Sequence, residues 1–242
     1  MSDDLLLDQY ARLLDAVPAG DPWPTLAESG FLDLLRPEPA GGAGLDLEAL
    51  FPLALETGRR ADPPPVLETM AARLKDPEAL GVADVEPVLG RPLAAALAAG
   101  QMAGAMLEVQ RMTVDYALQR QQFGREIGKF QAIQHQLAVL AEEAMAARIA
   151  AQAAFVGSPL EVSERRAAVA KLRAGQAALQ VCAIAHAVHG AIGVSQEHDL
   201  HHYTRRLRAW RLAHGGEAWW ARRLGDWALA ERQDVTSLAR AI

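Results

Sequence analysis

The chain has 242 residues, 51% of them apolar and 22% charged, which is typical of a globular protein with a sizeable core and not of a disordered chain. Its 30 acidic and 24 basic side chains give a formal net charge of −6. This balance argues against a nucleic-acid binder, because phosphate binding relies on surplus Lys and Arg. The single cysteine, Cys182, excludes an internal disulfide, and we expect a reducing cytoplasm.

The termini and the apolar runs predict neither export nor insertion into a membrane. The first residues are acidic where a secretory signal carries positive charge. The longest uncharged apolar run, 93–107, is shorter than the ~20 residues that span a bilayer. We therefore expect a soluble protein.

Proline use divides the chain into two parts. Twelve of the 13 prolines lie at or before Pro92, and Pro159 alone follows. Proline inside a helix costs about 3 kcal/mol, so the first part is expected to hold short helices and the second part long ones. The predicted organisation is an N-terminal helical domain at 1–74, a linker at 75–91 and a C-terminal helical bundle at 92–242.

Hydrophobic spacing gives the expected elements in chain order. In the first part, helices are predicted at 5–17, 24–35, 45–60 and 66–74, with a turn-rich loop at 39–44. In the second part, apolar residues recur at helical spacing over 92–120 and again over 130–144. Gly100 and Gly104 on the first of these faces would let a neighbouring helix approach closely.

Capping signals place the remaining helices. Ser158, Pro159 and Glu161 form a capping-box pattern that predicts a helix start, and this helix would reach His189. A last helix is predicted at 217–232. No segment alternates apolar and polar residues over a length that favours a sheet, so the predicted class is all-α.

Three clusters of side chains could carry chemistry. The histidines could bind zinc or iron, but no further ligand completes such a site, and a hydrogen-bonded loop cluster is the favoured interpretation. The arginines suit solvated helix faces and ion pairs better than phosphate binding. The tryptophans, at helical spacing, are interpreted as core. The clusters are His186, His189, His198, Asp199, His201 and His202; Arg205, Arg206, Arg208, Arg211, Arg222 and Arg223; and Trp210, Trp219, Trp220 and Trp227.

The segment from Arg120 to Gln134 reads as a tight corner between two helices, with glycines at the bend. Such a corner can present Arg120 and the amide of Gln131 to an anionic ligand, although a purely structural corner is the simpler interpretation of the residues alone.

This corner resembles the Arg-x-x-Phe-Gly … Phe-Gln-Ala-Ile-Gln motif of the acyl-CoA dehydrogenase family. The likeness extends to 26–45, which is similar to the family's N-terminal helical domain, and to 189–201, which is similar to its C-terminal domain. The resemblance implies a flavoprotein oxidoreductase that removes hydrogens from the α and β carbons of an acyl-CoA. It also implies that Arg120, Phe123, Gln131 and Gly190 contact FAD, whose ADP half reaches a neighbouring subunit.

Three departures from the family pattern shape the functional hypothesis. The middle β domain, which covers the flavin ring in the family, is replaced by the linker 75–91. The catalytic glutamate is absent, because its two usual positions hold His214 and Ala94. The glutamine that contributes another ADP contact is replaced by Ala187.

What remains is the part that a subunit contributes to its neighbour's FAD. The resemblance therefore implies a non-catalytic subunit that shares FAD with a full-length acyl-CoA dehydrogenase, in a dimer or heterotetramer that acts on acyl-CoA thioesters of fatty acids or steroids. A scaffold that binds no flavin, a separate dehydrogenase that uses His214 as its base, and a metal hydrolase are the alternatives.

Overall fold

The computed structural model describes residues 3–18, 20–231 and 236. Within them the regular secondary structure is helical apart from one hairpin of two-residue strands, so the all-α class without a middle β domain is confirmed. The helices are α1 Asp3–Ala16, α2 Trp23–Glu28, α3 Leu47–Arg59, α4 Val66–Ala72, α5 Glu86–Leu89, α6 Arg91–Gln119, α7 Gln131–Ala154, α8 Glu164–His189, α9 Leu200–Leu212 and α10 Glu217–Ala230. The strands are β1 Gln121–Gln122 and β2 Arg125–Glu126, and single 3-10 turns cover Phe31–Asp33, Glu38–Ala40, Ile127–Lys129 and Gly190–Val194.

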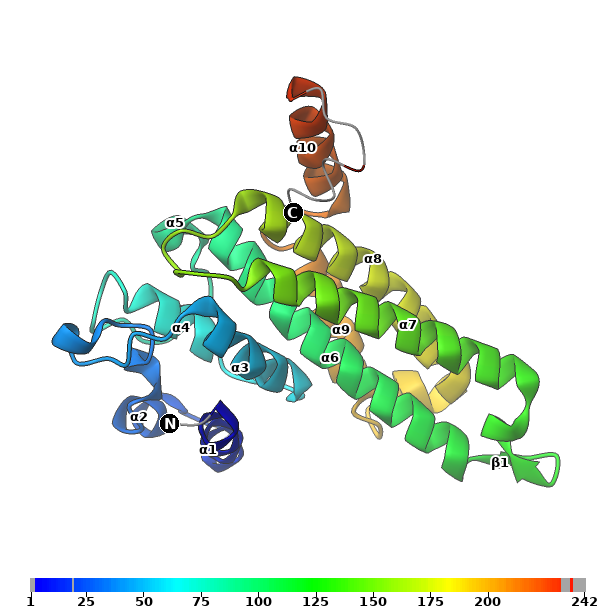
Figure 1. Cartoon of the computed structure of the whole chain (residues 1–242). Helices are drawn as coiled ribbons and strands as arrows, with labels where there is room; N and C mark the ends of the chain where they lie inside the picture. The colour runs from blue at the N-terminus through cyan, green and yellow to red at the C-terminus, as the bar shows by residue number, and fades with distance from the viewer. Residues whose placement is uncertain (1–2, 19, 232–235, 237–242) are drawn as a thin grey trace.

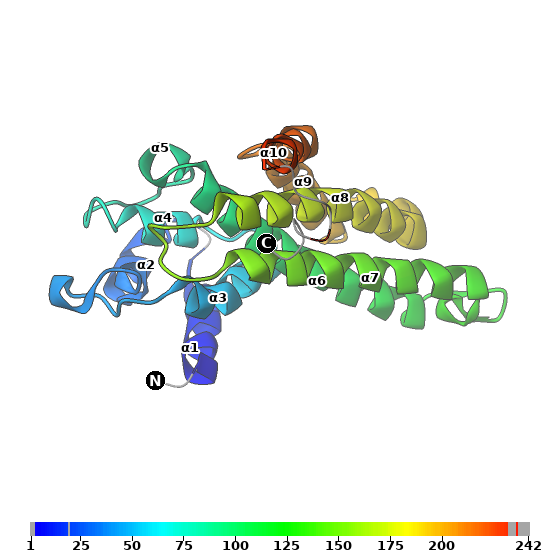
Figure 2. The same ribbon diagram turned by 45° about the horizontal axis from the view of Figure 1, so that its top comes forward.

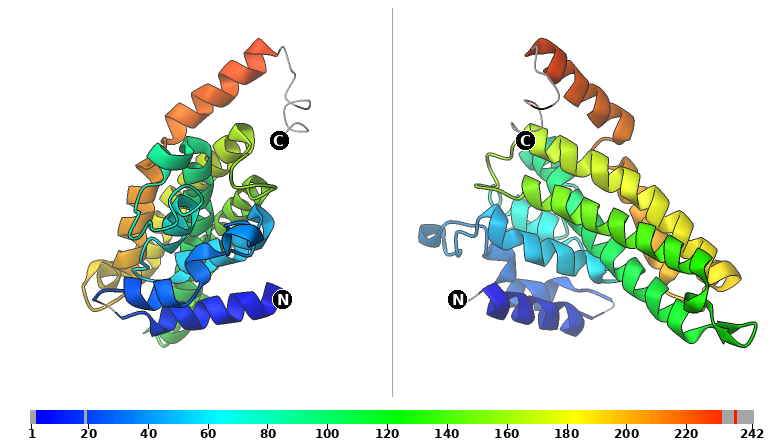
Figure 3. Two further views of the ribbon diagram at one scale, coloured as in Figure 1. Left: turned by 90° about the vertical axis from the view of Figure 1, so that its left-hand side faces the viewer. Right: turned by 45° about the vertical axis from the view of Figure 1, so that its right-hand side comes forward.

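Three long helices, α6, α7 and α8, lie side by side and form the body of the molecule (Figures 1 and 2). The N-terminal helices lie against one side of α6, and the hairpin closes the far end of the bundle. Helix α10 packs on α8 and projects away from the other helices (Figure 3).

Helix α6 is the centre of the packing. Every residue from Leu93 to Met106 is buried, because α6 is covered by α3 on one side and by α7, α8 and α9 on the others. The single apolar face predicted for this helix is therefore too narrow.

Glycines allow α3 and α6 to pack almost backbone to backbone. A Cβ atom at Gly104 would overlap the carbonyl of Leu55, and one at Gly58 would overlap the carbonyl of Gln101. At Gly100 a Cβ would lie 2.8 Å from the ring of Phe155. The close approach predicted at Gly100 and Gly104 is confirmed, and Gly58 contributes to it from α3.

Two predicted helix boundaries are wrong. The helix expected at 24–35 is interrupted by Gly30, whose φ of 76° lies in the left-handed region that favours glycine. The helix expected to start at Ser158 starts at Glu164, because Ser163 is its N-cap and accepts a hydrogen bond from the backbone of Arg166. Ser158 instead accepts the backbone N–H of Leu160 in the preceding turn.

The last helices agree with the sequence pattern in part. Helix α8 ends at His189 and α10 begins at Glu217, as predicted. Residue 232, the expected end of α10, lies outside the described residues. Trp220 is fully buried, whereas Trp219 is 40% exposed, so the interpretation of the tryptophans as core holds only for some of them.

Two helical stretches in the described residues are long and apolar enough to cross a membrane, α6 and 164–194. Most of the apolar part of α6 is buried inside the bundle. A core helix passes the same test, so this length and composition are weak evidence for a membrane.

Candidate functional site

The corner after α6 is a β-hairpin rather than a direct connection of two helices. Gln121 pairs with Glu126 and Gln122 with Arg125. The two turn residues, Phe123 and Gly124, have φ angles of 52° and 77°, as in the two-residue turns that match the twist of a hairpin. Sequence reasoning missed these strands because each has only two residues.

Phe123 is the unusual residue of this turn. A bulky residue at positive φ is strained, and the side chain of Phe123 is 92% exposed. Its ring meets the ring of Phe130 edge-on, with 6.2 Å between the two ring centres. The guanidinium of Arg125 lies over the ring of Phe130, 4.1 Å from its centre. The hairpin thus holds an aromatic ring out from the body at a conformational cost, which is the kind of strain that collects at functional sites.

Arg120 sits at the base of the hairpin as the C-cap of α6. Its backbone N–H donates to Tyr116 and its carbonyl accepts from Ile127, which fixes the start of the hairpin. The side chain is exposed, and no hydrogen bond or ion pair to another described residue is recorded for its guanidinium. The hairpin therefore holds the backbone of Arg120 and leaves its guanidinium available to a ligand.

A cavity of about 510 Å³ lies between the hairpin and the end of α8. Arg120, Phe123 and Gly190 all line it, so the structure brings together three of the four residues expected to contact FAD. Its other walls are largely aromatic and apolar, and include Tyr116 and Phe130.

Gln131, the fourth residue, does not line this cavity. It is exposed at the first position of α7, directly after Phe130.

Gly190 ends α8 with φ 64° and ψ −144°, a conformation essentially restricted to glycine, and it starts the 3-10 turn that forms one wall of the cavity.

Three aromatic rings pack against one another at the wall of the cavity. The imidazole of His189 lies 4.5 Å from the ring of Tyr116 and 4.7 Å from that of His198. Its Nδ1 donates to the carbonyl of Ala185 at 2.8 Å. Burial lowers the pKa of His189, and the bond to Ala185 opposes this shift, so the ring is a neutral packing element.

Three other histidines of the cluster make local side-chain hydrogen bonds. His186 contacts the hydroxyl of Thr204 at 3.2 Å, His198 accepts the backbone N–H of Leu200, and His201 bonds the carbonyl of His198. In the described part of the chain, no group of three or more His, Cys, Asp or Glu side chains is placed to hold a metal ion.

The arginines after residue 200 serve mainly the fold. Arg206 donates to the carbonyls of Gly58, Arg60 and Ala61 at the end of α3. Arg211 pairs with Glu217, and Arg223 with Glu164. The ion pairs of Arg211 and Arg223 agree with the interpretation as ion pairs, whereas the binding of Arg206 to the end of α3 was not expected. Arg205, Arg208 and Arg222 are exposed.

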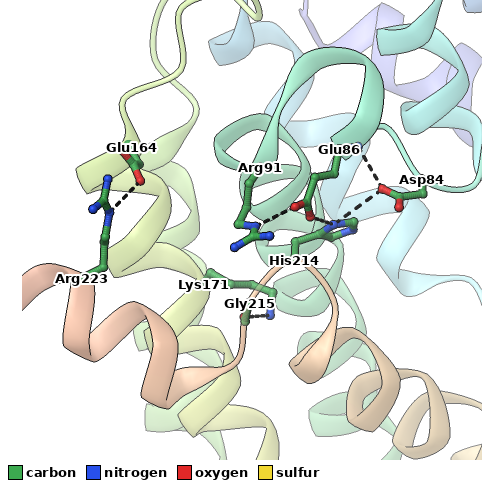
Figure 4. A network of polar contacts seen from close by, with 8 residues as sticks. All are labelled: Asp84, Glu86, Arg91, Glu164, Lys171, His214, Gly215 and Arg223. Carbon is green, nitrogen blue, oxygen red and sulfur yellow. Dashed lines mark hydrogen bonds and ion pairs between the residues drawn. The ribbon is translucent and has the colours of Figure 1, made fainter.

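His214 lies at the corner between α9 and α10, where it is held by the linker (Figure 4). Its Nδ1 is 3.0 Å from Oε2 of Glu86 and 3.8 Å from Oδ1 of Asp84. Glu86 also accepts from Arg91 at 2.7 Å. His214 has a φ of 56°, and its contacts with Glu86 and Asp84 hold its side chain against the linker.

Lys171 holds the same corner from inside the bundle. It is 1% exposed, and its Nζ donates to the carbonyls of Arg211 at 2.9 Å and Gly215 at 3.1 Å (Figure 4). Burial lowers the pKa of Lys171 to about 8. Sequence reasoning missed Lys171 and Glu86; a lysine in the Ala-rich face of α8 was the one available signal. Ala94, the second position considered for a base, is buried in α6.

Comparison with known proteins agrees with this architecture. A model of the acyl-CoA dehydrogenase C-terminal domain matches residues 89–229. Acyl-CoA dehydrogenase IpdE2 of Mycobacterium tuberculosis is 38% identical over 128 residues, which are 51% of this chain and 39% of that protein. The chain therefore spans about two-fifths of the length of this relative.

Solved structures show the same fold. The ChsE4-ChsE5 complex from Mycobacterium tuberculosis matches with a TM-score of 0.76 and 18% identity, over 96% of this chain and 98% of the matched chain. A variant of the Tcur3481-Tcur3483 steroid ACAD matches with a TM-score of 0.75 and 22% identity, over 95% and 98% of the two chains.

A three-helix body with a short hairpin, a glycine-ended α8 and a flanking N-terminal helical layer defines a protein of the acyl-CoA dehydrogenase type. The match over residues 89–229 covers more than half of the chain. The chain belongs to the acyl-CoA dehydrogenase family, as a shortened form without the middle β domain.

Proposed function

We propose that the chain is a non-catalytic subunit of a heteromeric acyl-CoA dehydrogenase and helps a full-length partner subunit to hold FAD. When bound, FAD supplies the hydride acceptor for α,β-dehydrogenation of an acyl-CoA thioester. The observation that carries the proposal is that the exposed guanidinium of Arg120 lines the same cavity as the ring of Phe123, a residue with a strained backbone.

The residues of the hairpin end suit the ADP half of this cofactor. A guanidinium binds phosphate oxygens through charge-assisted hydrogen bonds, worth about 1.5–3 kcal/mol each. The rings of Phe123 and Phe130 can pack on a flat heterocycle, and Gly190 leaves its wall free of a side chain. Gln131, on the outer surface of α7, would reach only a ligand that extends beyond the cavity toward a second subunit.

The corner at His214 supports a non-catalytic role. A general base must reach the proton it removes, whereas only 14% of the side chain of His214 is exposed. Ala94 offers no titratable group. The hydride would have to pass to a flavin held mainly by the partner.

Exposed apolar side chains on α7 support association with another subunit. Met145 and Ile149 lie one turn apart on the same face of α7 and are 45% and 60% exposed. Exposed apolar patches mark interaction surfaces. We propose that they contact the partner in a dimer or heterotetramer.

The substrate class follows the similar proteins. One of the similar solved structures is named a steroid ACAD, and we extend this substrate class, a bulky ring-containing acyl-CoA, to the complex that would contain this chain. This part of the proposal rests on similarity alone.

The test is the flavin content of the complex formed on co-expression with a full-length acyl-CoA dehydrogenase encoded nearby. Arg120→Ala should lower the FAD-to-protein ratio at least tenfold after gel filtration, with the complex still formed. Arg205→Ala removes an exposed arginine of α9 and is the matched control. Unchanged flavin in Arg120→Ala would favour the scaffold alternative.

A further inference from the structure

A second cavity lies where the N-terminal helices meet the bundle, away from the hairpin. Its volume is about 220 Å³, roughly the share of liquid volume taken by seven water molecules. The prolines 63–65 and Trp210 form an apolar wall, and Glu68, Gln101 and Arg206 are its polar lining. None of these residues takes part in the FAD proposal.

Gln101 is the one polar side chain in the buried run 93–106 of α6, and it is 2% exposed. Its Nε2 donates to Oε1 of Glu68 at 2.7 Å. The other carboxyl oxygen of Glu68, Oε2, is buried and has no hydrogen-bond partner in the structure. A buried polar atom without a partner is costly. The pair of Glu68 and Gln101 therefore lacks one hydrogen-bond partner, which a ligand in the cavity would supply.

Burial shifts the pKa values of both ionisable groups in this wall. Burial raises the pKa of Glu68, opposed by the hydrogen bond from Gln101 and the nearby His214, and reinforced by Asp84. The carboxyl group therefore keeps its proton more readily than an ordinary glutamate, and when protonated it would donate from Oε2, because Oε1 already accepts from Gln101. Burial lowers the pKa of Arg206 to about 10, which leaves its guanidinium charged at neutral pH.

We infer that this cavity binds the head group of a short-chain carboxylate, which accepts hydrogen bonds from Glu68 and Gln101 near the positive charge of Arg206. A carboxylic acid donating to a carboxylate makes a short and strong hydrogen bond. The prolines and Trp210 suit the alkyl part of such a molecule. The head group could belong to a free short acid or to the end of a longer acyl chain.

The experiment uses the purified full chain with butyrate and butyramide, two probes of nearly equal size of which one is charged. Saturation-transfer NMR and tryptophan fluorescence report binding, since Trp210 lines the cavity. We expect butyrate to bind at least tenfold more tightly than butyramide at pH 6. Equal binding of both probes, or binding of neither, overturns the inference. Octanoate separates the two sources, because tighter binding than butyrate indicates the end of a longer chain and weaker binding a free short acid.

Two variants and a control localise the binding. Gln101→Leu should weaken butyrate binding at least tenfold, whereas Gln176→Leu, an exposed change on α8, should leave it unaltered. In the wild type, binding should weaken as pH rises and Glu68 loses its proton. Glu68→Gln cannot titrate and should bind with a flatter pH profile. Butyrate binding that survives Gln101→Leu, or an identical pH profile in Glu68→Gln, contradicts the assignment.

Discussion

The Nδ1 atom of His214 lies 3.0 Å from Oε2 of Glu86, a residue of the linker that stands in place of a whole domain. The two residues are 128 positions apart in the chain. The pair connects the linker to the corner between α9 and α10, and the carboxylate of Glu86 holds the Nδ1 side of the imidazole.

The first prediction concerns this pair in acid. Desolvation alone would raise the pKa of Glu86, but hydrogen bonds from His214 and Arg91 outweigh it and lower the pKa. A carboxyl with a lowered folded pKa stabilises the fold above its unfolded pKa, about 4.3, and loses this contribution as pH falls further. Glu86→Gln should therefore reduce the free energy of unfolding at pH 7 by about 1.5–3 kcal/mol and flatten its decline below pH 4. Urea unfolding at a series of pH values measures both the loss at pH 7 and the decline in acid.

Glu78→Gln, a change at an exposed residue of the same linker, is the control. An equal effect of the two changes would refute the pairing of Glu86 with His214.

The second prediction concerns Lys171 in base. Its folded pKa of about 8 lies below the ordinary value of 10.5, so the unfolded chain binds the proton more tightly. The penalty is full below pH 8 and is relieved as pH rises toward 10.5, by on the order of 3 kcal/mol. The wild type should therefore gain unfolding free energy relative to Lys171→Met as pH rises over this window. The exposed Lys75→Met should show no such change; parallel profiles for Lys171→Met and wild type would contradict the burial of the amine.

The third prediction tests the contact between α3 and α6. Gly104→Ala forces a methyl group into the carbonyl of Leu55, and overpacking of this kind costs about 1–3 kcal/mol or more. Gly225→Ala in α10 meets nothing within 4 Å and should stabilise the chain by about 0.5–1 kcal/mol, since alanine favours helix over glycine. Thermal unfolding of both variants checks the signs; a neutral Gly104→Ala would mean that the helices are farther apart.

The fourth prediction separates stability from function at the hairpin. Phe123→Asn gives the Asn-Gly pair that two-residue hairpin turns prefer, so it should stabilise the isolated chain by about 1 kcal/mol by removing strain. It should also lower the flavin content of the complex, because the aromatic contact is lost. A variant that gains stability and keeps its flavin would show that the ring of Phe123 contributes neither to stability nor to flavin binding.

The sequence predicts much of this fold because its signals are local. Proline placement and 3.6-residue spacing identified the long helices, and Gly104 indicated that a neighbouring helix approaches closely, although only the structure shows that this helix is α3. The start of α8 was mispredicted because Ser158 and Ser163 both carry capping signals, and only the packed structure decides between them. The hairpin was missed because its strands are too short to show alternation and its turn holds Phe123 instead of the usual asparagine.

The candidate site divides in the same way. Arg120, Phe123 and Gly190 could be singled out because they belong to a sequence motif, and the structure brings them to one cavity. The pairings of His214 with Glu86 and of Gln101 with Glu68 depend on which helices meet, which no local pattern reveals. Lys171 looks like a surface residue in the sequence, and its burial follows from the packing of α10 on α8.

The most direct test of the shared FAD site is an absorbance spectrum of the chain purified alone and after co-purification with a full-length acyl-CoA dehydrogenase partner. The account predicts a colourless chain alone and flavin absorbance in the complex. Flavin retained by the isolated chain, or a complex that holds no flavin, would contradict it.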